Sequence, residues 1–466
     1  MKVKRMDSLK RLIILQLSVV GLFLQTAIYA YFWLTEYYPF LHLHRRLNYY
    51  FKGHILILFV YLVLLFFFTS TFEGLKIGYL KPIDVFFSQL FALLAVNVVS
   101  YAQISLIANW LIRPAPIIET MGIQLIFSAV WVFLCDRLYH AVFPPRKLLL
   151  VHGSRPIEDI INKFESRKDK YLLDGSINID AGIEAVKKEI TAGYGAVVLW
   201  DISVDERNTL LKYCYSRSIR VYMMPKISDV LVKGSDQLHL FDTPILLTRE
   251  YALKIEQRIV KRIIDLVCAL LLLIIASPIM LLTAATIKLY DGGPVLYKQI
   301  RCTRDARKFY ILKFRSMRVD AEKDGVARLA QRNDARITPV GKFIRAVRID
   351  ELPQLLNILK GDMSFIGPRP ERPEIIEQYL EEMPEFAFRM KVKAGLAGYA
   401  QVYGKYNTTP YDKLKLDLTY IENYSVWMDL KLMLLTVKIL FKPESTEGID
   451  SSQITAAKKN VAEKDE

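Results

Sequence analysis

The sequence is short of the two residue types that most often build metal and nucleophile sites. Its four cysteines, Cys135, Cys214, Cys268 and Cys302, show no Cys-x-x-Cys spacing and have no histidine partners at metal-ligand spacing. All six histidines lie at or before His239. We therefore expect the cysteines to be packing residues in a reducing compartment. Any chemistry beyond residue 258 must use carboxylates, hydroxyls, lysines or a metal ion.

The sequence also lacks a basic run interleaved with aromatic residues, the pattern typical of a nucleic-acid groove. Its charge is nevertheless +15, from 63 Lys and Arg against 48 Asp and Glu. Hydrophobic residues make up 52% of the chain and charged residues 24%, so apolar segments must alternate with soluble ones. The basic surplus therefore fits an anionic lipid surface or phosphate-rich substrates, and no nucleic-acid partner is expected.

Long apolar runs predict a transmembrane domain of four helices over residues 1–145. The first run, Leu12 to Leu34, follows a basic segment, is longer than a signal-peptide core and has no cleavage site after it. Further runs occur at about 54–72, 83–109 and 115–143, each long enough for the roughly 20 residues that cross a bilayer. Lys and Arg are richer at both ends of this domain than in its loops, so both ends are expected to be cytoplasmic. The loop that holds Arg45, Arg46 and Lys52 departs from this rule.

Residues 146–250 change to alternating strands and amphipathic helices, which predict a Rossmann-like α/β domain. Parallel strands are expected at Lys147–Val151, Ala196–Trp200 and Arg220–Met224, and helices at Arg155–Phe164, Ile183–Thr191 and Val204–Ser216. Gly153 follows the first strand alone, without the Gly-x-Gly-x-x-Gly that lets a backbone approach a pyrophosphate. We therefore favour a packing or regulatory role over dinucleotide binding.

A fifth apolar run, Ile263 to Tyr290, is broken near its middle by Ser277-Pro278. A transmembrane helix is one interpretation, because the run is long enough to span at about 1.5 Å per residue. Basic residues on both flanks and the helix-bending proline instead favour a re-entrant helix that returns to the face it entered. Near the C-terminus, Val426–Phe441 is too short to span a bilayer and is expected to lie in its interface. A polar tail is expected at 446–466.

The stretch from Ile349 to Arg372 holds the candidate catalytic carboxylates. Asp350 and Glu351 are expected at the start of a short helix that has Pro353 in its first turn and ends at Gly361. Two acids at a helix start can also be simple caps. Here basic residues surround them, namely Arg336, Lys342, Arg345 and Arg348 before the pair and Arg369 after it. Carboxylates among phosphate-binding groups indicate a metal or phosphoryl-transfer site.

Four motifs carry a resemblance to one enzyme family. They are Lys313-Phe-Arg-Ser-Met317, Ile337-Thr-Pro-Val-Gly341, Asp350-Glu-Leu-Pro-Gln-Leu355 and Gly367-Pro-Arg-Pro-Glu371. In order, spacing and identity this set resembles the bacterial sugar transferases, the polyprenyl-phosphate glycosyl-1-phosphate transferases, in their large monotopic form. The resemblance covers residues 258–445 and implies a monotopic catalytic domain with a re-entrant membrane helix. The Rossmann-like domain likewise resembles the middle domain of the large sugar transferases.

The resemblance implies transfer of a sugar 1-phosphate from a UDP-sugar to undecaprenyl phosphate, with release of UMP. This would be the first membrane step of exopolysaccharide, capsule or O-antigen synthesis. Both substrates are anionic, and a carboxylate nucleophile splits the reaction into two steps that avoid their direct encounter. By resemblance, Asp350 is that nucleophile, through a phosphosugar-aspartyl intermediate, and Glu351 is a ligand of Mg²⁺. Oxygen ligands with no thiol or imidazole nearby agree with magnesium.

The resemblance also implies a set of substrate-binding residues. They are Lys313, Arg315, Pro368, Arg369, Pro370 and Gln401. The basic pair Lys313 and Arg315 would meet phosphates, with an ion pair to nearby carboxylates as the alternative. Arg369 would hold a phosphate or the nucleotide, and its flanking prolines could equally just shape the loop. Gln401 lies in a glycine-rich turn that would border the donor.

The chain departs from the family pattern in two places. After Gln299 the family has a glycine-containing turn, where this chain has Cys302-Thr-Arg-Asp-Ala306. The usual Lys-Pro-Gly-Leu-Thr-Gly appears as Lys393-Ala-Gly-Leu-Ala-Gly398. Neither difference touches the carboxylate pair, so they bear on donor binding and leave the reaction class in place.

Two other functions stay open at this point. A metal-dependent glycosyltransferase that moves the sugar alone would use an Asp-x-Asp motif, and the soluble region holds no convincing one. A non-catalytic membrane scaffold or nucleotide sensor of polysaccharide assembly would be centred on the βαβ domain. Release of UDP in place of UMP would favour the first, and survival of function in Asp350→Asn would favour the second.

The expected protein therefore combines a membrane α-helical part with α/β parts. Its predicted divisions are 1–145 (four transmembrane helices), 146–250 (Rossmann-like), 258–445 (sugar transferase) and 446–466 (tail). We expect it in the bacterial inner membrane, with the catalytic domain on the cytoplasmic face and the lipid bilayer, a UDP-sugar and undecaprenyl phosphate as partners. The membrane block and the middle domain offer surface for a homodimer. The donor sugar, whether glucose, galactose or an N-acetylated or modified sugar, stays open.

Overall fold

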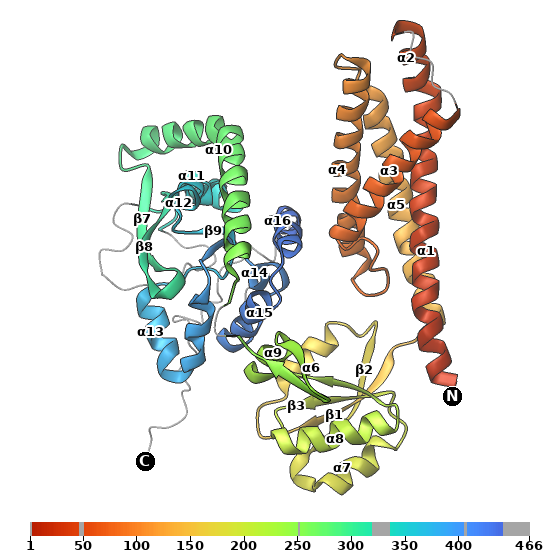
Figure 1. Cartoon of the computed structure of the whole chain (residues 1–466), viewed down its shortest axis with the longest axis vertical. Coiled ribbons are helices and arrows are strands. Elements are labelled where there is room, and N and C mark those ends of the chain that lie inside the picture. The colour runs from red at the N-terminus through yellow and green to blue at the C-terminus, as the bar shows by residue number, and fades with distance from the viewer. Residues whose placement is uncertain (1, 46–50, 250–251, 319–335, 405–407, 441–466) are drawn as a thin grey trace. The chain divides into compact units, whose positions relative to one another are not determined.

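The computed structural model describes residues 2–45, 51–249, 252–318, 336–404 and 408–440. Its elements group into two compact units, Met1–Pro225 and Lys226–Glu466, which are described separately below (Figure 1). The finer division into four parts stays a prediction. The expected tail at 446–466 lies outside the described residues.

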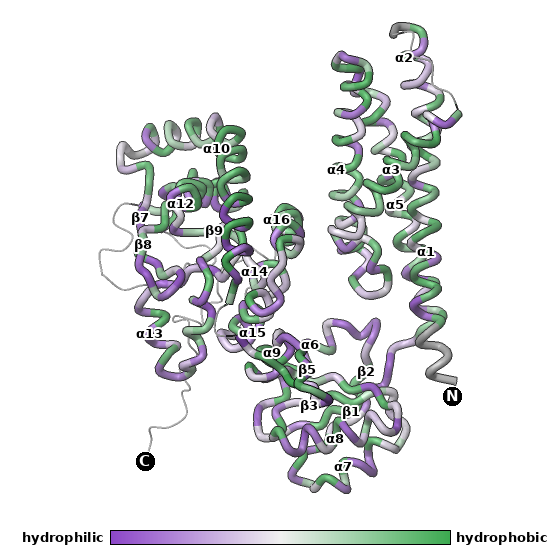
Figure 2. The backbone as a smooth tube through the Cα atoms, viewed as in Figure 1, coloured by the Kyte–Doolittle hydropathy of each residue, from purple (hydrophilic) through white to green (hydrophobic). Residues whose placement is uncertain are grey.

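The first unit begins with long apolar helices. Helix α1 (Lys2–Phe32) continues through a π-helical turn (Trp33–Tyr37) into α2 (Tyr38–Arg45), and α3 (Phe51–Thr71), α4 (Pro82–Ala108) and α5 (Ala115–Val142) follow. Together with α10 (Ile255–Asp291) of the second unit, the described residues contain five helices long and apolar enough to cross a membrane. Figure 2 colours the backbone by residue hydropathy and shows hydrophobic residues along these helices. The predicted membrane character is confirmed at this level, whereas the four-helix arrangement in a bilayer stays a prediction.

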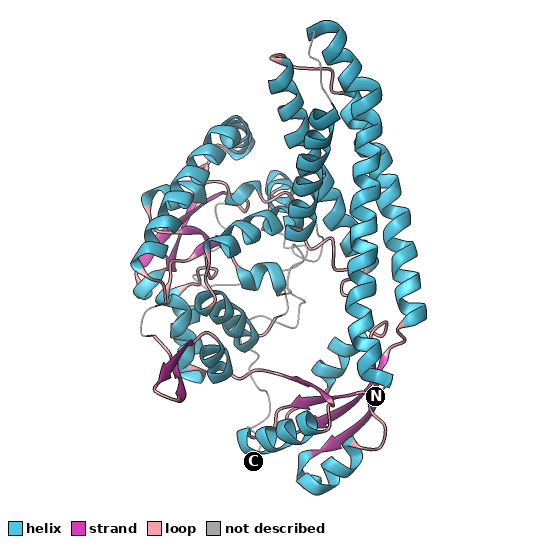
Figure 3. Cartoon of the chain, turned by 45° about the vertical axis from the view of Figure 1, so that its right-hand side comes forward, coloured by secondary structure: helices cyan, strands magenta, loops and turns pink. Residues whose placement is uncertain are grey.

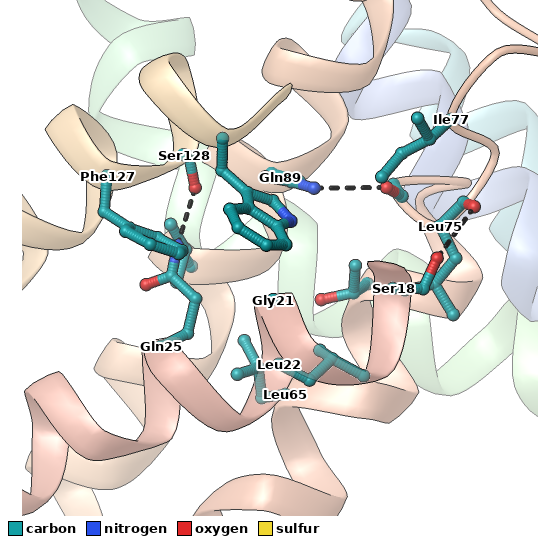
Figure 4. Close-up of a pocket in the computed structure, with 14 residues that line it drawn as sticks. Ser18, Gly21, Leu22, Gln25, Leu65, Leu75, Ile77, Gln89, Phe127 and Ser128 are labelled. Carbon is teal, nitrogen blue, oxygen red and sulfur yellow. Dashed lines mark hydrogen bonds between the residues drawn. The ribbon is translucent and has the colours of Figure 1, made fainter. Parts of the chain in front are cut away.

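Polar side chains link these helices in their interior. Gln124 on α5 donates to Tyr61 on α3 at 2.8 Å, and Asn97 on α4 donates to Gln124 at 2.9 Å. Gln25 on α1 donates to Ser128 on α5 at 2.8 Å, beside the pocket that Figure 4 shows. Uncharged hydrogen bonds of this kind join membrane helices because an unpaired polar group in hydrocarbon is costly. The network therefore favours one mutual arrangement of the helices.

The remainder of the first unit is a parallel α/β sheet in the order β2-β1-β3-β4. Its elements are β1 (Arg146–His152), α6 (Glu158–Glu165), β2 (Tyr171–Asn178), α7 (Ile183–Ile190), β3 (Ala196–Trp200), α8 (Val204–Ser216) and β4 (Arg220–Met223). The predicted βαβ layout is confirmed. Strand β2 was not predicted, because it is an edge strand whose burial alternates and whose pairing with β1 shifts register near Gly175.

The central strand β1 is covered on both faces, which explains its unbroken apolar sequence. Leu149 and Val151 pack with residues of α7 and α8, and Leu150 packs with residues of α6. After β1, a Cβ at Gly153 would lie 2.0 Å from the carbonyl oxygen of Asp201. Glycine is therefore needed for a backbone contact at this strand end, which agrees with the packing role favoured from the sequence.

The second unit combines the long helix α10 with shorter helices and short strands (Figure 3). Before α10 come α9 (Ile227–Lys233) and the hairpin β5 (Asp236–Leu240) and β6 (Thr243–Leu247). After it come the hairpin β7 (Leu296–Cys302) and β8 (Lys308–Phe314), α11 (Pro339–Ala346), α12 (Gln354–Lys360), β9 (Ser364–Ile366) and α13 (Pro373–Glu382). The 3-10 segment η5 (Pro384–Lys391), β10 (Gly395–Ala397), α14 (Tyr399–Tyr403), α15 (Pro410–Glu422) and α16 (Val426–Leu440) complete it. Strands β9 and β10 pair in parallel.

Helix α10 changes direction partway along its length, as Figure 1 shows. The helix contains Pro278, which has no N–H to bond the carbonyl of Ile274 four residues earlier. The hydroxyl of Ser277 donates to that carbonyl instead, at 2.8 Å. A proline and a local hydroxyl bond are sufficient to bend a helix at this point. The bend is compatible with the expected re-entrant path, which stays a prediction.

The first half of α10 is tied to the core of its unit by polar side chains. Arg262 donates to two carbonyl groups at the end of α12, at 2.6 and 2.8 Å. Asp265 accepts the backbone N–H of Phe365 in β9 at 2.9 Å, and Lys261 lies 2.6 Å from the buried Asp429 of α16. These bonds join the apolar helix to α12, β9 and α16.

The turn between β7 and β8 stores backbone strain. Asp305 has φ +57° and Ala306 has φ +55°, in the left-handed region that side chains disfavour. This is the place where the resembling family has a glycine-containing turn. This chain therefore adopts the left-handed turn without glycine, the residue that adopts it at no steric cost.

We predict that Ala306→Gly stabilises the second unit, because glycine removes a steric cost of about 1 kcal/mol at positive φ. The expected result is a rise of about 2–4 °C in its thermal unfolding midpoint. The control is Ala346→Gly at the exposed end of α11, which should lower the midpoint slightly because glycine weakens a helix. A lower midpoint for Ala306→Gly would contradict the strain argument.

Candidate active site

The two candidate carboxylates lie on a short 3-10 turn, Ile349–Glu351, that precedes α12. We expected the carboxylates at the start of the helix itself, and this was wrong by about one turn. Helix α12 starts at Gln354, with Pro353 as its N-cap, so the carboxylates lie just before it. The expected end is confirmed, because Gly361 has φ +94° and caps α12 in the left-handed conformation. Arg348 has φ +59° and bends the chain between α11 and this turn. Such a strained non-glycine residue persists only where its surroundings hold it.

Glu351 is held by three basic side chains from three separate segments. Its Oε1 accepts from Lys313 Nζ of β8 at 3.1 Å and from Arg369 Nη2 at 3.1 Å. Its Oε2 lies 3.8 Å from Arg348 Nη1, and the side chain is only 13% exposed. Burial alone would raise the pKa of Glu351, but the charges of Lys313, Arg369 and Arg348 outweigh burial and hold that pKa well below its usual value. Glu351 is therefore an anchored anion.

Asp350 has the opposite environment. Among the residues that the structure describes, its carboxylate makes no hydrogen bond and no ion pair within 4 Å. Burial raises the pKa of Asp350, and the neighbouring charge of Glu351 raises it further, while Lys313 and Arg345 act in the other direction. When a desolvated carboxylate accepts no hydrogen bonds, the lone pairs of its oxygens are available for nucleophilic attack. The two neighbours thus differ in what they can do.

Strand β8 places the basic pair predicted from the sequence. Lys313 reaches Glu351, and burial lowers the pKa of this lysine despite the nearby carboxylate. Arg315, two residues later, is 8% exposed, and its guanidinium lies against Gly293, where a Cβ would be 1.9 Å from Nη1. The structure therefore brings Lys313 to the carboxylate pair and packs Arg315 at the end of α10.

Arg369 is presented by the loop that follows β9. A Cβ on Gly395 of β10 would lie 2.1 Å from the backbone nitrogen of Gly367, so the two chains touch through glycines. Pro368 and Pro370 are buried on either side of Arg369. The pKa of Arg369 is raised, with the charge of Glu351 as the main cause. This loop directs one guanidinium at Glu351.

Gln401 lies on α14, which packs against α15 and α16. Within the described part of the chain it makes no hydrogen bond to Asp350 or Glu351, and its buried Oε1 has no hydrogen-bond partner. Its role beside a donor stays a prediction.

Sequence reasoning missed a second buried charge cluster behind the Arg369 loop. Glu371 binds Lys413, and its carboxylate lies 3.7 Å from both Arg389 and Arg301. Arg389 in turn pairs with the buried Asp417 at 2.8 Å. Burial would raise the pKa of Glu371, but these bases lower it to about 2. A signal in the sequence was the charged residue Asp417 among the apolar residues of α15.

The described residues contain no group of three or more His, Cys, Asp or Glu that could enclose a metal ion. Magnesium, however, is usually held by one or two carboxylates together with substrate phosphates and water. Asp350 and Glu351 supply two such carboxylates side by side, in surroundings free of thiol and imidazole ligands within the described site. The donor set therefore fits Mg²⁺ brought in with a phosphorylated substrate.

Comparisons with known proteins converge on this region. The family model described as bacterial sugar transferase matches residues 256–443. An undecaprenyl-phosphate galactose phosphotransferase from Salmonella typhimurium is 34% identical over 371 residues, which is 67% of this chain and 75% of that relative.

Two further relatives are named for other sugars. A UDP-N-acetylgalactosamine-undecaprenyl-phosphate N-acetylgalactosaminephosphotransferase from Aeromonas hydrophila is 36% identical, over 57% of this chain and 60% of the relative. A UDP-glucose:undecaprenyl-phosphate glucose-1-phosphate transferase from Escherichia coli is 39% identical, over 44% of each chain. This chain thus spans less than two thirds of these two relatives.

The contrast between the carboxylates predicts opposite effects on stability. Asp350→Asn should raise the thermal midpoint at pH 7, because it removes a buried charge whose folded-state pKa is raised. Its advantage should shrink as pH falls and the native carboxyl becomes neutral. Glu351→Gln should lower stability by about 3 kcal/mol, because it leaves buried bases without their partner.

Thermal unfolding of the purified full chain between pH 5 and 8 measures both changes. Glu381→Gln, at an exposed carboxylate of α13, is the control and should change stability by less than about 0.5 kcal/mol. Equal and same-signed effects of the two site variants would refute the assigned asymmetry.

Proposed function

The chain belongs to the bacterial sugar transferase family, and we propose that it transfers a sugar 1-phosphate from a UDP-sugar to undecaprenyl phosphate. The observation that carries the proposal is the difference between Glu351, which is anchored by bases, and Asp350, which pairs with none of the described residues. An anchored anion can organise charge, whereas an unpaired carboxylate can attack. The names of the relatives support the donor and acceptor classes.

In the first step, a carboxylate oxygen of Asp350 attacks the phosphorus that carries the sugar. A bond forms between Asp350 and phosphorus, and the bond from phosphorus to the bridging oxygen breaks, so UMP leaves with that electron pair. Lys313 and Arg369 lie within 3.1 Å of the adjacent Glu351 and supply the positive charge that the diphosphate requires. The product is a phosphosugar-aspartyl intermediate.

In the second step, a phosphate oxygen of undecaprenyl phosphate attacks the same phosphorus. The bond between phosphorus and Asp350 breaks, which regenerates the carboxylate and leaves the sugar on a lipid diphosphate. The two-step route keeps the anionic donor and the anionic acceptor from meeting directly. A raised pKa at Asp350 suits this exchange, because a more basic carboxylate is a better nucleophile.

Mg²⁺ is part of this proposal, with Glu351 as the residue that would hold it beside the donor phosphates. When bound, the ion would neutralise diphosphate charge and polarise the departing oxygen. Arg348, 3.8 Å from Oε2 of Glu351, would offset the negative charge on that oxygen.

A lipid acceptor requires that the second unit bind the membrane, and the proposal therefore includes its attachment. Helix α10 would enter the cytoplasmic leaflet and return through its bend at Pro278, and α16 would lie in the interface. Exposed Phe343 and Val347 lie just before the turn that carries Asp350 and would add to this contact. The carboxylates would then lie near the headgroups, where the acceptor phosphate resides.

The reaction is tested by mixing detergent-purified protein, Mg²⁺ and undecaprenyl phosphate with UDP-glucose, UDP-galactose and UDP-N-acetylgalactosamine. We expect UMP from at least one donor, and a loss of at least about 10³-fold in Asp350→Asn, because the nucleophile is removed. A donor labelled in its sugar should also leave label on the wild-type protein when the acceptor is omitted. The Glu381→Gln variant should retain wild-type turnover.

Release of UDP would identify a transferase of the sugar alone. Full turnover in Asp350→Asn would show that Asp350 is only an acidic residue near a helix end and would rule out the covalent mechanism. No nucleotide release from any donor would favour the membrane scaffold.

The re-entrant path is tested by cysteine labelling in a variant without the four native cysteines. Exposed Glu256 lies in the first turn of α10 and exposed Lys298 lies after its end, and cysteines at both positions should react from the cytoplasmic face. A cysteine at exposed Trp110, between α4 and α5, should react from the opposite face. Labelling of positions 256 and 298 from opposite faces would make α10 a spanning helix.

A further inference from the structure

We propose that Arg389 is a positioning residue that aims Arg369 at Glu351 by clamping the backbone of the loop between them. The inference concerns the same site as the proposed function and rests on it for its effect on turnover. Arg389 lies on η5, outside the four motifs that carry the family resemblance. It contacts neither carboxylate of the catalytic pair.

The loop from Pro368 to Glu371 is bound at every carbonyl. Pro368 accepts from the backbone N–H of Gly395 at 3.0 Å, and Glu371 accepts from that of Cys302 at 3.0 Å. Between them, two arginine side chains donate to the two central carbonyls, one each to Arg369 and Pro370. Four consecutive carbonyls with four different donors define the loop path in a way that the two prolines alone do not.

Arg389 makes the central contact of this clamp. Its Nη2 donates to the carbonyl of Arg369 at 3.0 Å, and the same guanidinium bonds Asp417 at 2.8 and 3.0 Å. Its Nη1 lies 3.7 Å from Glu371, and the side chain is only 3% exposed. The planar guanidinium thus joins α15 to the residue whose side chain reaches the site, a geometry that a single ammonium group cannot reproduce.

Arg301 supports the next carbonyl from another direction. Its Nη1 donates to Pro370 at 3.2 Å, and its Nη2 donates to Gln299 at 2.7 Å along β7. Arg301 and Arg389 both lie 3.7 Å from the carboxylate of Glu371. Glu371 therefore holds the two clamping arginines together. This gives a structural role to a charge cluster that takes no direct part in the reaction.

The clamp acts on chemistry through the direction of one side chain. Arg369 donates to Glu351 at 3.1 Å, and the backbone carbonyl of the same residue is the atom that Arg389 holds. A displacement of about 1 Å in a positioning group can cost on the order of 100-fold in rate. Loosening the clamp should therefore impair turnover while Asp350 and Glu351 both remain.

The test is a double-mutant cycle of Arg389→Lys with Arg369→Gln in the full chain, measured as UMP release and as thermal midpoint. Arg389→Lys alone should lower kcat/KM about 10–100-fold. In the Arg369→Gln background, the same lysine substitution should change the rate by less than about threefold, because its target is already gone. The cost of Arg369→Gln in stability should also shrink once Arg389 is replaced.

Arg167→Lys is the matched control. This arginine of the first unit also bonds a carboxylate, Asp169 at 2.8 Å, and a backbone carbonyl, that of Tyr79 at 2.9 Å. It should leave turnover unchanged. Should Arg389→Lys fail to fold, Arg301→Lys replaces it in the cycle, since Arg301 binds a single carbonyl of the loop and is 18% exposed.

Wild-type turnover in Arg389→Lys would overturn the inference. So would rate effects that multiply in the double variant, because these indicate a general structural defect. A wild type that releases no UMP would end the proposed function instead. The thermal midpoints of the same double-mutant cycle would then still decide whether Arg389 acts through Arg369. Additive changes in midpoint would show that it does not.

Discussion

The second unit depends on the balance of charge around one carboxylate. Glu351 gathers Lys313 from β8, Arg348 from the end of α11 and Arg369 from the loop after β9, and a buried charge without its partner is costly. Each base is itself partly desolvated, so none of the three segments can move away alone. The strained backbone of Arg348 is tolerated because this arrangement requires its side chain at that point. The site is therefore a structural centre as well as a chemical one.

Adjacent residues acquire different properties here through their surroundings alone. Glu351 has three bases and a lowered pKa, whereas Asp350 has burial, a like-charged neighbour and a raised pKa. Pairs of titratable groups whose environments push their pKa values apart are typical of sites that assign them different roles. The same separation has a cost, because the carboxylate left for reaction is the one that destabilises the fold. Local instability at Asp350 is offset by the bonds that Glu351 makes.

Local sequence patterns predicted the features that depend on near neighbours. The buried strands of the α/β sheet, helix α8, the bend at Pro278 and the left-handed end of α12 at Gly361 all follow from short-range rules. Strands β2, β5, β6 and β7 were missed because few or none of their residues are buried, whereas β8 was missed although Phe309, Ile311 and Phe314 are buried. The charge cluster around Glu371 was missed for a different reason. Its partners lie far away in the chain, as Lys413 does, so no local pattern announces them.

Helix α10 explains how an apolar element can organise a charged site. Its first half is bonded to the end of α12 through Arg262, and its second half packs Ile287 against Phe314 of β8 and Ile344 of α11. The turn with both carboxylates lies in sequence between α11 and α12, so its two ends are supported by one helix. A straight helix of 37 residues would be about 55 Å long and would direct its second half away from α11. The bend at Pro278 is thus what lets one apolar helix support both sides of the turn that carries the two carboxylates.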